Sequence, residues 1–464
     1  MKIRNLNKRI AISLSTSLGL CVLLAGATQA AELPSLGSDP NSVSRLAPGE
    51  SLEDFFTAAL DYSPRMRIAE ESLNIGAARK QAATGQLLPQ VQANGSVSDN
   101  RRGVGPQVEN FDGQRYSVQL NQVLFNWRAF SARKQALLVE DQLEAQYYYE
   151  LATVLTDVAD RYFTVLQAQD ALDSIASELE AVQNQLDQIQ SLYDRQLAQI
   201  TDLYQAQASL AAVRSQQLQL QSELAIAEES LRSVSGIDVG DLYQLQADAE
   251  IPEVEENIDY CAEQARVNNQ QIEASEYALQ AADERISERR GSYMPEVSFI
   301  AQRQDSDLGF DNRTQPRTET TYYGLNVSIP IYAGGANRAQ VREAQSQRNI
   351  AENELRQVEL ETNESVRTAY LQVQSSASRT ESAQILAEST ALSAEAMQQG
   401  FNLGVVTSVD LLNALRDQFQ AERDFQRARY EHVRYLLQLK REAGLLVPAD
   451  LIEVSSWLTD PANQ

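Results

Sequence analysis

The side chains that could do chemistry in this 464-residue chain are mostly carboxylates, with one histidine, His432, and two cysteines, Cys21 and Cys261. A Ser-His-Asp or Cys-His catalytic group would have to be built around His432. That histidine lies in a helical stretch rich in arginine and glutamate, where we expect a solvated surface side chain. The sequence also lacks Cys/His metal-binding spacings, phosphate loops and dinucleotide-binding glycine patterns. These residue types argue against an enzyme and predict no metal and no cofactor.

The strongest chemical signal is an acidic residue that occurs twice in the same setting. Asp202 in Ile200-Thr201-Asp202-Leu203 returns 208 residues later as Asp410 in Ser408-Val409-Asp410-Leu411. Carboxylates that converge in a pore make its lumen negative and favour cations over anions. The formal net charge of −25 also argues against a nucleic-acid partner, which requires basic surface. Solubility alone is a simpler explanation for most of that charge.

The two acids belong to a longer repeat. At offsets of 206 to 208 residues, further matches join Pro89 to Pro295, Leu124-Phe125 to Ile331-Tyr332, and Gly236 to Gly444. A nearly constant offset indicates a tandem structural duplication. The predicted organisation is a first repeat at 51–236, a linker at 237–257, a second repeat at 258–444 and a C-terminal tail at 445–464.

The N-terminus predicts export. Basic residues at the start, an apolar stretch at 10–26 and the small-residue site Thr28-Gln29-Ala30 are typical of a signal peptide covering residues 1–30. The alternative is a lipoprotein anchored at Cys21, but Leu20 stands where a lipobox has Gly, Ala or Ser. Removing the signal peptide changes the net charge from −25 to −29 and leaves Cys261 as the sole cysteine, so no intrachain disulfide can form. Residues 31–50, with three prolines, read as an extended lead-in.

Each repeat starts with a helix and two strands. In the first repeat we expect a helix at 51–85, strands at 89–98 and 115–125, and a polar surface loop at 99–114. In the second we expect a helix at 258–291, strands at 296–302 and 321–331, and a polar loop at 303–319. Apolar and polar residues alternate along these strands, as at Tyr323, Leu325 and Val327, which is the pattern of a strand with one apolar face.

Two very long helices complete each repeat. Residues 126–235 contain neither glycine nor proline, and their apolar residues step by three and four, as in a coiled-coil seam. The seam comprises Leu172, Ile175, Leu179, Val182, Leu186, Ile189 and Tyr193 before a turn near 197–201, and Leu203, Leu210, Val213, Leu220, Leu224, Ala227, Leu231 and Val234 after it. The second repeat has a helix at 338–399, a turn at 400–407 and a return helix to Gly444. At 1.5 Å per residue, a helix of roughly 65 residues spans on the order of 100 Å.

These elements point to a channel. Strands of about ten residues with one apolar face match the wall of a membrane β-barrel. Four strands from one chain cannot close a barrel, and lipid does not tolerate an open sheet edge. Two chains would give about eight strands, which their own side chains fill, whereas three would give about twelve and leave a pore. The alternatives are a soluble half-buried sheet packed on a helix, and a non-transport periplasmic or surface coiled-coil scaffold protein.

With this order of elements, the chain closely resembles the TolC outer-membrane efflux family. The matching segments are Leu88-Pro89-Gln90, Leu120-Asn121-Gln122-Val123-Leu124-Phe125, Ile200-Thr201-Asp202, Ser328-Ile329-Pro330-Ile331-Tyr332-Ala333-Gly334-Gly335 and Gly400-Phe401-Asn402-Leu403-Gly404-Val405-Val406-Thr407-Ser408-Val409-Asp410-Leu411-Leu412. The resemblance implies a mainly α protein with a small antiparallel β part. Its homotrimer would share a 12-stranded transmembrane barrel in the outer membrane, continued in the periplasm by a long α-helical coiled-coil barrel.

The family's function follows as an expectation. The resemblance implies a passive exit duct of a tripartite efflux pump or a type I secretion system, serving multidrug resistance or protein secretion. It implies outer-membrane lipid, a periplasmic adaptor (membrane fusion) protein and an inner-membrane pump of RND, ABC or MFS type as partners.

The resemblance also implies an acidic periplasmic gate. In the family, acidic residues after the second helical turn form rings that narrow the mouth. Asp410 matches the first ring, and Asn413 stands where the second ring has Asp. Thr407 and Asp410 are also spaced as a capping box, so helix capping alone is an alternative role for Asp410.

Family members latch the closed mouth by hydrogen bonds from a Tyr and an Arg on the second turn to a Thr-Asp pair on the first. Thr201 and Asp202 match that pair, but Phe401 and Val406 stand at the Tyr and Arg positions. Both donors are therefore missing, which predicts a more easily opened channel. No Thr precedes Asp202 by three residues, so we expect it to act more by contact than by capping.

Docking of the adaptor would fall on the two turns. The family's hairpin-tip glycine matches Gly404 in Leu403-Gly404-Val405, but Gln196 in Arg195-Gln196-Leu197. Close approach of a partner helix is therefore expected at the second turn and is doubtful at the first.

Overall fold

A computed structural model describes residues 50–246, 249, 251–252, 254, 257–308 and 314–459, apart from the side chains of Val104 and Thr314. The predicted signal peptide at 1–30, all of the lead-in except Glu50, and the end of the tail lie outside the described residues.

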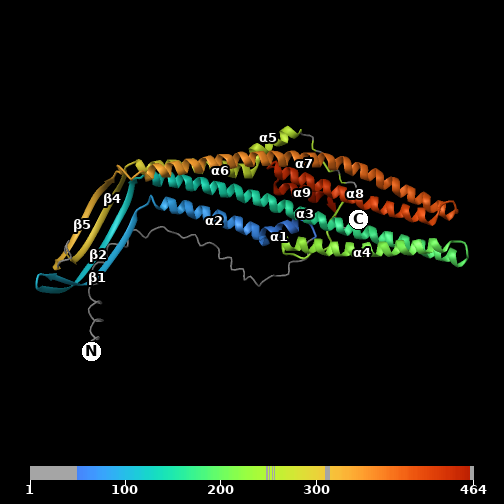
Figure 1. Cartoon of the computed structure of the whole chain (residues 1–464), viewed down its shortest axis with the longest axis horizontal. Coiled ribbons are helices and arrows are strands. Elements are labelled where there is room, and N and C mark those ends of the chain that lie inside the picture. Colours follow the sequence, from blue (N-terminus) through green and yellow to red (C-terminus); the bar gives the residue numbers. More distant parts are fainter. Residues whose placement is uncertain are drawn as a thin grey trace, which may run out of the picture. The chain divides into compact units, whose positions relative to one another are not determined.

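The same order of helices and strands occurs twice (Figure 1). The first half comprises α1 (Leu52–Tyr62), α2 (Pro64–Gly85), β1 (Gln90–Val104), β2 (Gln107–Phe125), α3 (Trp127–Asp194) and α4 (Ile200–Ser235). The second half comprises α5 (Ile258–Asn268), α6 (Gln270–Arg290), a 3-10 helix η1 (Gly291–Tyr293), β4 (Glu296–Leu308), β5 (Thr314–Ser328), α7 (Ala336–Asn402) and α8 (Ser408–Glu442). Three short elements are β3 (Gln244–Leu245), α9 (Pro448–Ser456) and β6 (Leu458–Thr459). The prediction of a mainly α protein with a small antiparallel β part is confirmed.

Each half begins with two short helices where the sequence predicted one. α1 and α2 meet at Ser63, which is extended with φ −62° and ψ 121°. Pro64 follows it, and proline disfavours helical conformation in the preceding residue. In the second half the break is at Asn269, whose Oδ1 accepts hydrogen bonds from the N–H groups of Gln271 and Ile272 at 2.9 and 3.3 Å. The predicted continuous helices at 51–85 and 258–291 are therefore wrong.

The four long strands form one antiparallel sheet in the order β1-β2-β4-β5. The hairpins join through β2 and β4, so β1 and β5 form the edges within the chain. β1 and β2 pair up to Val104 and Gln107, around a two-residue turn at Gly105 and Pro106. The predicted loop at 99–114 is therefore strand, as is much of 303–319. Polar sequence does not prevent this, because the ladder bonds backbone groups. β5 ends at Ser328, not at 331, shortly before Pro330.

The strand register places like side chains in rows across the sheet. One row consists of Val91, Leu120, Ala301 and Tyr323. On the opposite face, the adjacent row consists of Gln92, Gln119, Gln302 and Tyr322. Val91 and Tyr323 are 65% and 70% exposed although they are large and apolar. The sheet therefore presents an exposed apolar face and a face rich in amides.

Two long helical hairpins continue from the sheet. α3 and α7 contain 68 and 67 residues, and each turns back at its end far from the sheet into α4 or α8 (Figure 1). The predicted seam between α3 and α4 is confirmed by one buried group, here named the tip cluster. It consists of Ile175, Val182, Ile189, Leu203, Ala206, Leu210, Val213 and, from α8, Leu412.

The largest buried cluster lies at the middle of α3, where α1, α4, α8 and α9 contribute side chains. Tyr162 of α3 is fully buried, and its hydroxyl donates to the carbonyls of Glu50 at 3.1 Å and Tyr243 at 2.9 Å. The linker and the tail are more than connections, because β3 of the linker pairs with β6 of the tail beside this core.

His432 is not the solvated surface residue predicted from its neighbours. It is 5% exposed, and its Nδ1 lies 2.8 Å from the Oγ of Ser376 on α7. The prediction rested on the charged residues that neighbour His432 in the sequence. The helical period instead places His432 on the same face as the buried Ala428 and Leu436.

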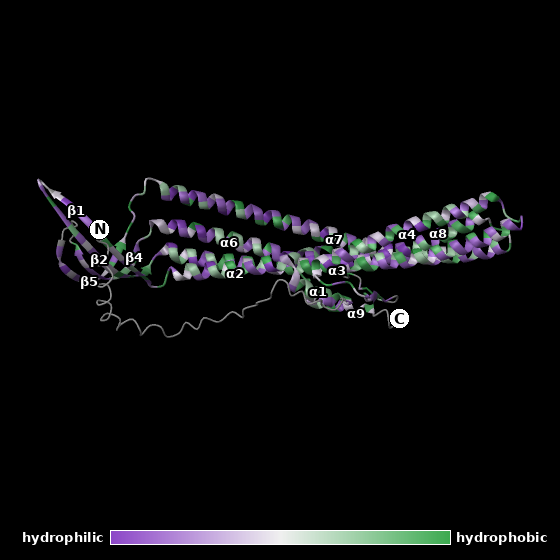
Figure 2. Ribbon diagram, turned by 90° about the horizontal axis from the view of Figure 1, so that it is seen from below, coloured by the Kyte–Doolittle hydropathy of each residue, from purple (hydrophilic) through white to green (hydrophobic). Residues whose placement is uncertain are grey.

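Hydrophilic and hydrophobic residues interleave along the long helices (Figure 2). Among the described residues, no helix combines the length and the hydrophobicity needed to cross a membrane.

Candidate gate and docking turns

The turn between α3 and α4 is built on a Schellman motif. The N–H groups of Gln196 and Leu197 donate to the carbonyls of Tyr193 and Leu192, both at 2.8 Å. The motif needs a left-handed residue after the helix, and Gln196 supplies it with φ 63°. Within the described part of the chain, it is the one non-glycine residue with positive φ. Leu197 is 72% exposed, and Arg195 is exposed beside it.

The turn between α7 and α8 uses the same motif. The N–H groups of Gly404 and Val405 donate to the carbonyls of Phe401 and Gly400, both at 3.0 Å. Gly404 has φ 76°, and a Cβ added there would meet no atom within 4 Å. Leu403 and Val405 are 80% and 77% exposed. Both turns thus present exposed aliphatic side chains, which can pack against another protein but supply no catalytic group.

Thr407 caps the first turn of α8, and Asp410 bonds to it. The Asp410 N–H donates to Thr407 Oγ1 at 3.2 Å, and the Thr407 hydroxyl donates back to Asp410 Oδ2 at 2.6 Å. One half of the capping box predicted from the sequence is therefore present, and the Asp410 carboxylate accepts from the Thr407 hydroxyl. Asp410 and Asn413 are both exposed near the start of α8, so capping leaves Asp410 accessible to ions.

Thr201 and Asp202 bond within their own turn. Thr201 Oγ1 donates to Gln199 Oε1 at 3.3 Å, and Asp202 Oδ2 accepts from the Gln199 N–H at 3.4 Å. Asp202 therefore contributes to capping, and its expected role in contacts stays a prediction. Neither residue bonds to the second hairpin in the hydrogen bonds given above. Near these turns, Gln188 Nε2 of α3 donates to Asn402 Oδ1 of α7 at 3.3 Å and so joins the two hairpins.

Apolar packing occupies the positions of the two missing latch donors. Phe401 is partly buried against the tip cluster, which belongs mainly to the first hairpin. Val406 folds over Gly400, where its Cγ2 would lie 2.6 Å from an added Cβ. The structure therefore brings Phe401 to the first hairpin and keeps Val406 on the second.

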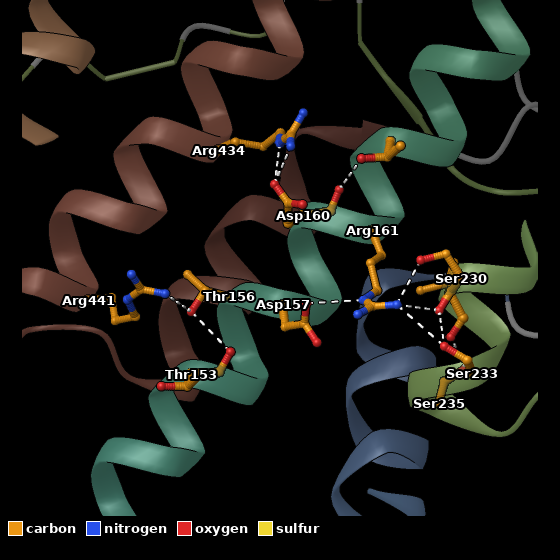
Figure 3. A network of polar contacts seen from close by, with 12 residues as sticks. Thr153, Thr156, Asp157, Asp160, Arg161, Ser230, Ser233, Ser235, Arg434 and Arg441 are labelled. Atoms are coloured by element: carbon orange, nitrogen blue, oxygen red, sulfur yellow. Dashed lines mark hydrogen bonds and ion pairs between the residues drawn. The ribbon is translucent and has the colours of Figure 1, made fainter. Parts of the chain in front are cut away.

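Polar contacts follow the boundary between α3 and α8. Near the middle of α3, Arg434 pairs with Asp160, and Arg441 donates to Thr156 Oγ1 at 3.5 Å (Figure 3). Nearer the turns, the hydroxyl of Tyr430 donates to Asp170 Oδ2 at 2.6 Å. In these three contacts the acceptors lie on α3 and the donors on α8. In the opposite direction, Ser174 Oγ of α3 donates to the Phe419 carbonyl of α8 at 3.5 Å.

The most buried ion pair of this boundary escaped the sequence analysis. Arg423 Nη1 lies 2.8 Å from Glu178 Oε2, with side chains 10% and 2% exposed. The available signal was that Glu178 and Gln185, seven residues apart, flank the predicted seam and so share one helix face. Both are buried.

Burial raises the pKa of the Asp170 carboxyl above its ordinary value, and the negative charges of Asp173 and Glu422 act in the same direction. The hydrogen bond from Tyr430 and the charge of Arg429 oppose this shift without cancelling it. Burial and the charge of Asp170 also raise the pKa of the Tyr430 hydroxyl, which therefore remains a donor.

The sequence profile of the family described as outer membrane efflux protein matches residues 56–237 and 261–445, one stretch in each half. The chain belongs to this family. Membership places it among outer-membrane proteins of the efflux type and confirms the resemblance read from the motifs.

Individual relatives span nearly the whole chain. Outer membrane protein TolC of Escherichia coli strain K12 is 24% identical over 441 residues, which cover 92% of this chain and 89% of that protein. The alkaline protease secretion protein AprF of Pseudomonas aeruginosa is 24% identical over 415 residues, covering 86% of this chain and 85% of its own. The crystal structure of the Campylobacter jejuni CmeC outer membrane channel matches with a TM-score of 0.76 at 15% identity, over 89% of this chain and 90% of that one. That structural match shows the shared fold.

Proposed function

We propose that this protein is the trimeric exit duct of a tripartite efflux pump or of a type I secretion system. It acts as a passive channel that crosses the outer membrane as a shared 12-stranded barrel and the periplasm as a helical tunnel. The observation that carries the proposal is the four-stranded sheet, which has two unpaired edges and one exposed apolar face. An open edge and exposed apolar side chains suit lipid only when further copies complete the wall.

The helices support the same assembly. Exposed apolar side chains lie on α4 and α7, for example Leu218 and Ile226 at 68% and 66%, and Leu392 at 68%. Large exposed apolar surfaces mark contacts with other molecules. α4 of one copy and α7 of the next are therefore the proposed neighbours in the helical barrel, as β1 and β5 are in the sheet.

The proposed gate lies at the two turns. In a trimer, three exposed Asp410 carboxylates near one axis would repel one another and attract cations, while Asn413 adds no charge one turn later. Thr201, Asp202, Phe401 and Val406 form the surrounding mouth. Because Phe401 and Val406 donate no side-chain hydrogen bond, the mouth opens more easily than in members that carry both latch donors.

The exposed aliphatic turn residues are the proposed docking sites for a periplasmic adaptor, with an inner-membrane pump of RND, ABC or MFS type behind it. Leu403, Gly404 and Val405 form the closer contact, and the turn with Arg195, Gln196 and Leu197 forms the looser one. The family's description names efflux and the name of AprF names protease secretion, so both transport roles stay within the proposal.

The predicted division of the chain is part of this proposal. A signal peptide at 1–30 directs export, and a tandem duplication produced the repeats at 51–236 and 258–444. The two separate family matches support the duplication.

The deciding experiment is purification in detergent from the membrane fraction, followed by mass measurement in solution and planar-bilayer recording. A trimer that conducts ions supports the proposal. A monomer that washes off the membrane and conducts nothing contradicts it and favours a coiled-coil scaffold.

A further inference from the structure

The boundary between the two hairpins differs in chemistry from the interior of the first hairpin. Between α3 and α4 the buried side chains are aliphatic, as in the tip cluster. Near the middle of α3, Val433 and Leu437 of α8 pack into the largest buried cluster. From there towards the turns, the contacts between α3 and α8 are largely polar and include the Glu178–Arg423 ion pair. The aliphatic contribution that crosses this boundary near the turns is Leu412, with Phe401 partly buried beside it.

Glu178 and Arg423 form the central contact of this boundary. Arg423 Nη1 lies 2.8 Å from Glu178 Oε2 and 3.4 Å from Ser174 Oγ, so both acceptors lie on α3. Among the ion pairs in the described residues, this pair is the most buried, at 10% and 2% exposure. Burying a charge is unfavourable unless it is paired, so each partner holds the other in place.

A polar boundary can separate more readily than an aliphatic seam. When two aliphatic faces part, each is exposed to water without compensation. When Glu178 and Arg423 part, both charges regain hydration, which offsets part of the lost attraction. Gln185 Nε2 on α3 and Ser408 Oγ on α8 are also buried in the described structure without a hydrogen-bond partner, so water reaching them would favour separation.

We propose that the Glu178–Arg423 ion pair is the latch that holds the second hairpin against the first in the closed channel. It holds the hairpins together away from the mouth, where the Tyr and Arg donors of other family members are missing. Opening of the proposed gate then means separation of α8 from α3 between the largest buried cluster and the turns, while that cluster and the aliphatic α3–α4 seam stay intact. This inference rests on the proposed channel function.

Planar-bilayer current through the purified trimer tests the latch, with three variants beside the unaltered protein. Glu178→Gln leaves the Arg423 charge buried without its counter-charge, and we expect the time-averaged current to rise about tenfold or more. The double variant Glu178→Leu with Arg423→Met replaces the pair by apolar groups, which is often neutral or stabilising. We expect its current to fall below that of the unaltered protein. Opposite effects at one site distinguish a latch from general damage to the fold.

The matched control is Glu431→Gln. It breaks an ion pair with Arg379 inside the second hairpin, 3.1 Å long and more exposed, and should leave the current unchanged. Equal currents in the unaltered protein and all variants would overturn the latch while leaving the channel in place. A rise in the double variant matching that of Glu178→Gln would also overturn it. If even the unaltered trimer passes no ions at any voltage, the channel proposal fails and the latch fails with it.

Discussion

Gln196 and Gly404 lie 208 residues apart and occupy the same left-handed position of two Schellman motifs, with φ 63° and 76°. In each turn, two backbone hydrogen bonds of 2.8 to 3.0 Å close the end of the long helix around this residue. The backbone is therefore the same at both tips, and the side chains differ. Glycine adopts this conformation without strain, whereas glutamine does not.

The strain at Gln196 predicts that Gln196→Gly stabilises the protein. Relief of the left-handed conformation, less the entropy of a more flexible unfolded chain, should raise the free energy of unfolding by about 0.5 to 1 kcal/mol. Denaturant unfolding in detergent measures this change in the free energy of unfolding. Gln205→Gly, in the exposed interior of α4, should instead destabilise by about 1 kcal/mol. If both substitutions destabilise equally, Gln196 is not strained.

Gly404→Trp tests docking at the second turn. The left-handed backbone at Gly404 adds strain to any other residue, as at Gln196, but the new side chain has room in the isolated chain, because no atom lies within 4 Å of its Cβ position. We therefore expect normal trimer assembly but loss of adaptor co-purification and of pump-dependent resistance. Gln196→Trp, at the matching position of the first turn, should have a smaller effect. Full adaptor binding by Gly404→Trp would exclude close approach there.

Two substitutions separate the capping and ion-binding roles of Asp410. Asp410→Asn keeps an oxygen that can accept from the Thr407 hydroxyl but removes the charge, whereas Asp410→Ala removes both. Divalent-cation block of the current should be relieved by either variant if the carboxylates form a ring. Asp410→Ala should also lose about 0.3 to 1 kcal/mol of stability through the weaker helix start. Block that persists in both variants would leave capping as the sole role.

Val406→Arg would restore a donor that the family's latch uses. If that arginine bonds to Thr201 or Asp202 as in the family's latch, we expect it to lower the resting current. Val405→Arg is the control, because that side chain is 77% exposed at the neighbouring position of the turn. An unchanged current in Val406→Arg, with a tightly closed unaltered channel, would contradict the easily opened mouth.

Asp170 should make stability depend on pH. Burial raises its pKa above the ordinary 3.8, so the folded protein holds this proton more tightly than the unfolded chain does. Its contribution to stability is fully present below pH 3.8 and is lost as the pH rises through the raised value. Asp170→Asn keeps an acceptor for the Tyr430 hydroxyl without the charge. This variant should therefore unfold at a higher temperature than the unaltered protein at pH 7. Its unfolding temperature should also change less with pH above pH 4.

Tyr430→Phe is the counterpart of that experiment. It removes the hydroxyl that donates to Asp170 Oδ2 at 2.6 Å, so the buried carboxylate loses a hydrogen bond. Its unfolding temperature at pH 7 should fall. A rise would show that the hydrogen bond contributes nothing at this site.

The sequence by itself determined the long helices, the paired strands and their repeated order. The period of three and four from Leu172 to Tyr193 predicts a seam, and the structure buries Ile175, Val182 and Ile189 in it. The recurrence of Asp202 as Asp410 predicts equivalent helix starts, and both acids contact their own turns. These features follow from local spacing, because helix and strand periods and caps depend on residues close in the chain.

Only the tertiary structure decided which helices meet and with what chemistry. Glu178 and Arg423 are 245 residues apart, and no local pattern pairs them. His432 is buried by α7 although its neighbours are charged, and the polar segments at 99–104 and 107–114 are paired strand although their composition resembles a loop. The physical reason is that burial and backbone pairing depend on what packs opposite a residue, which contacts between distant segments of the chain set.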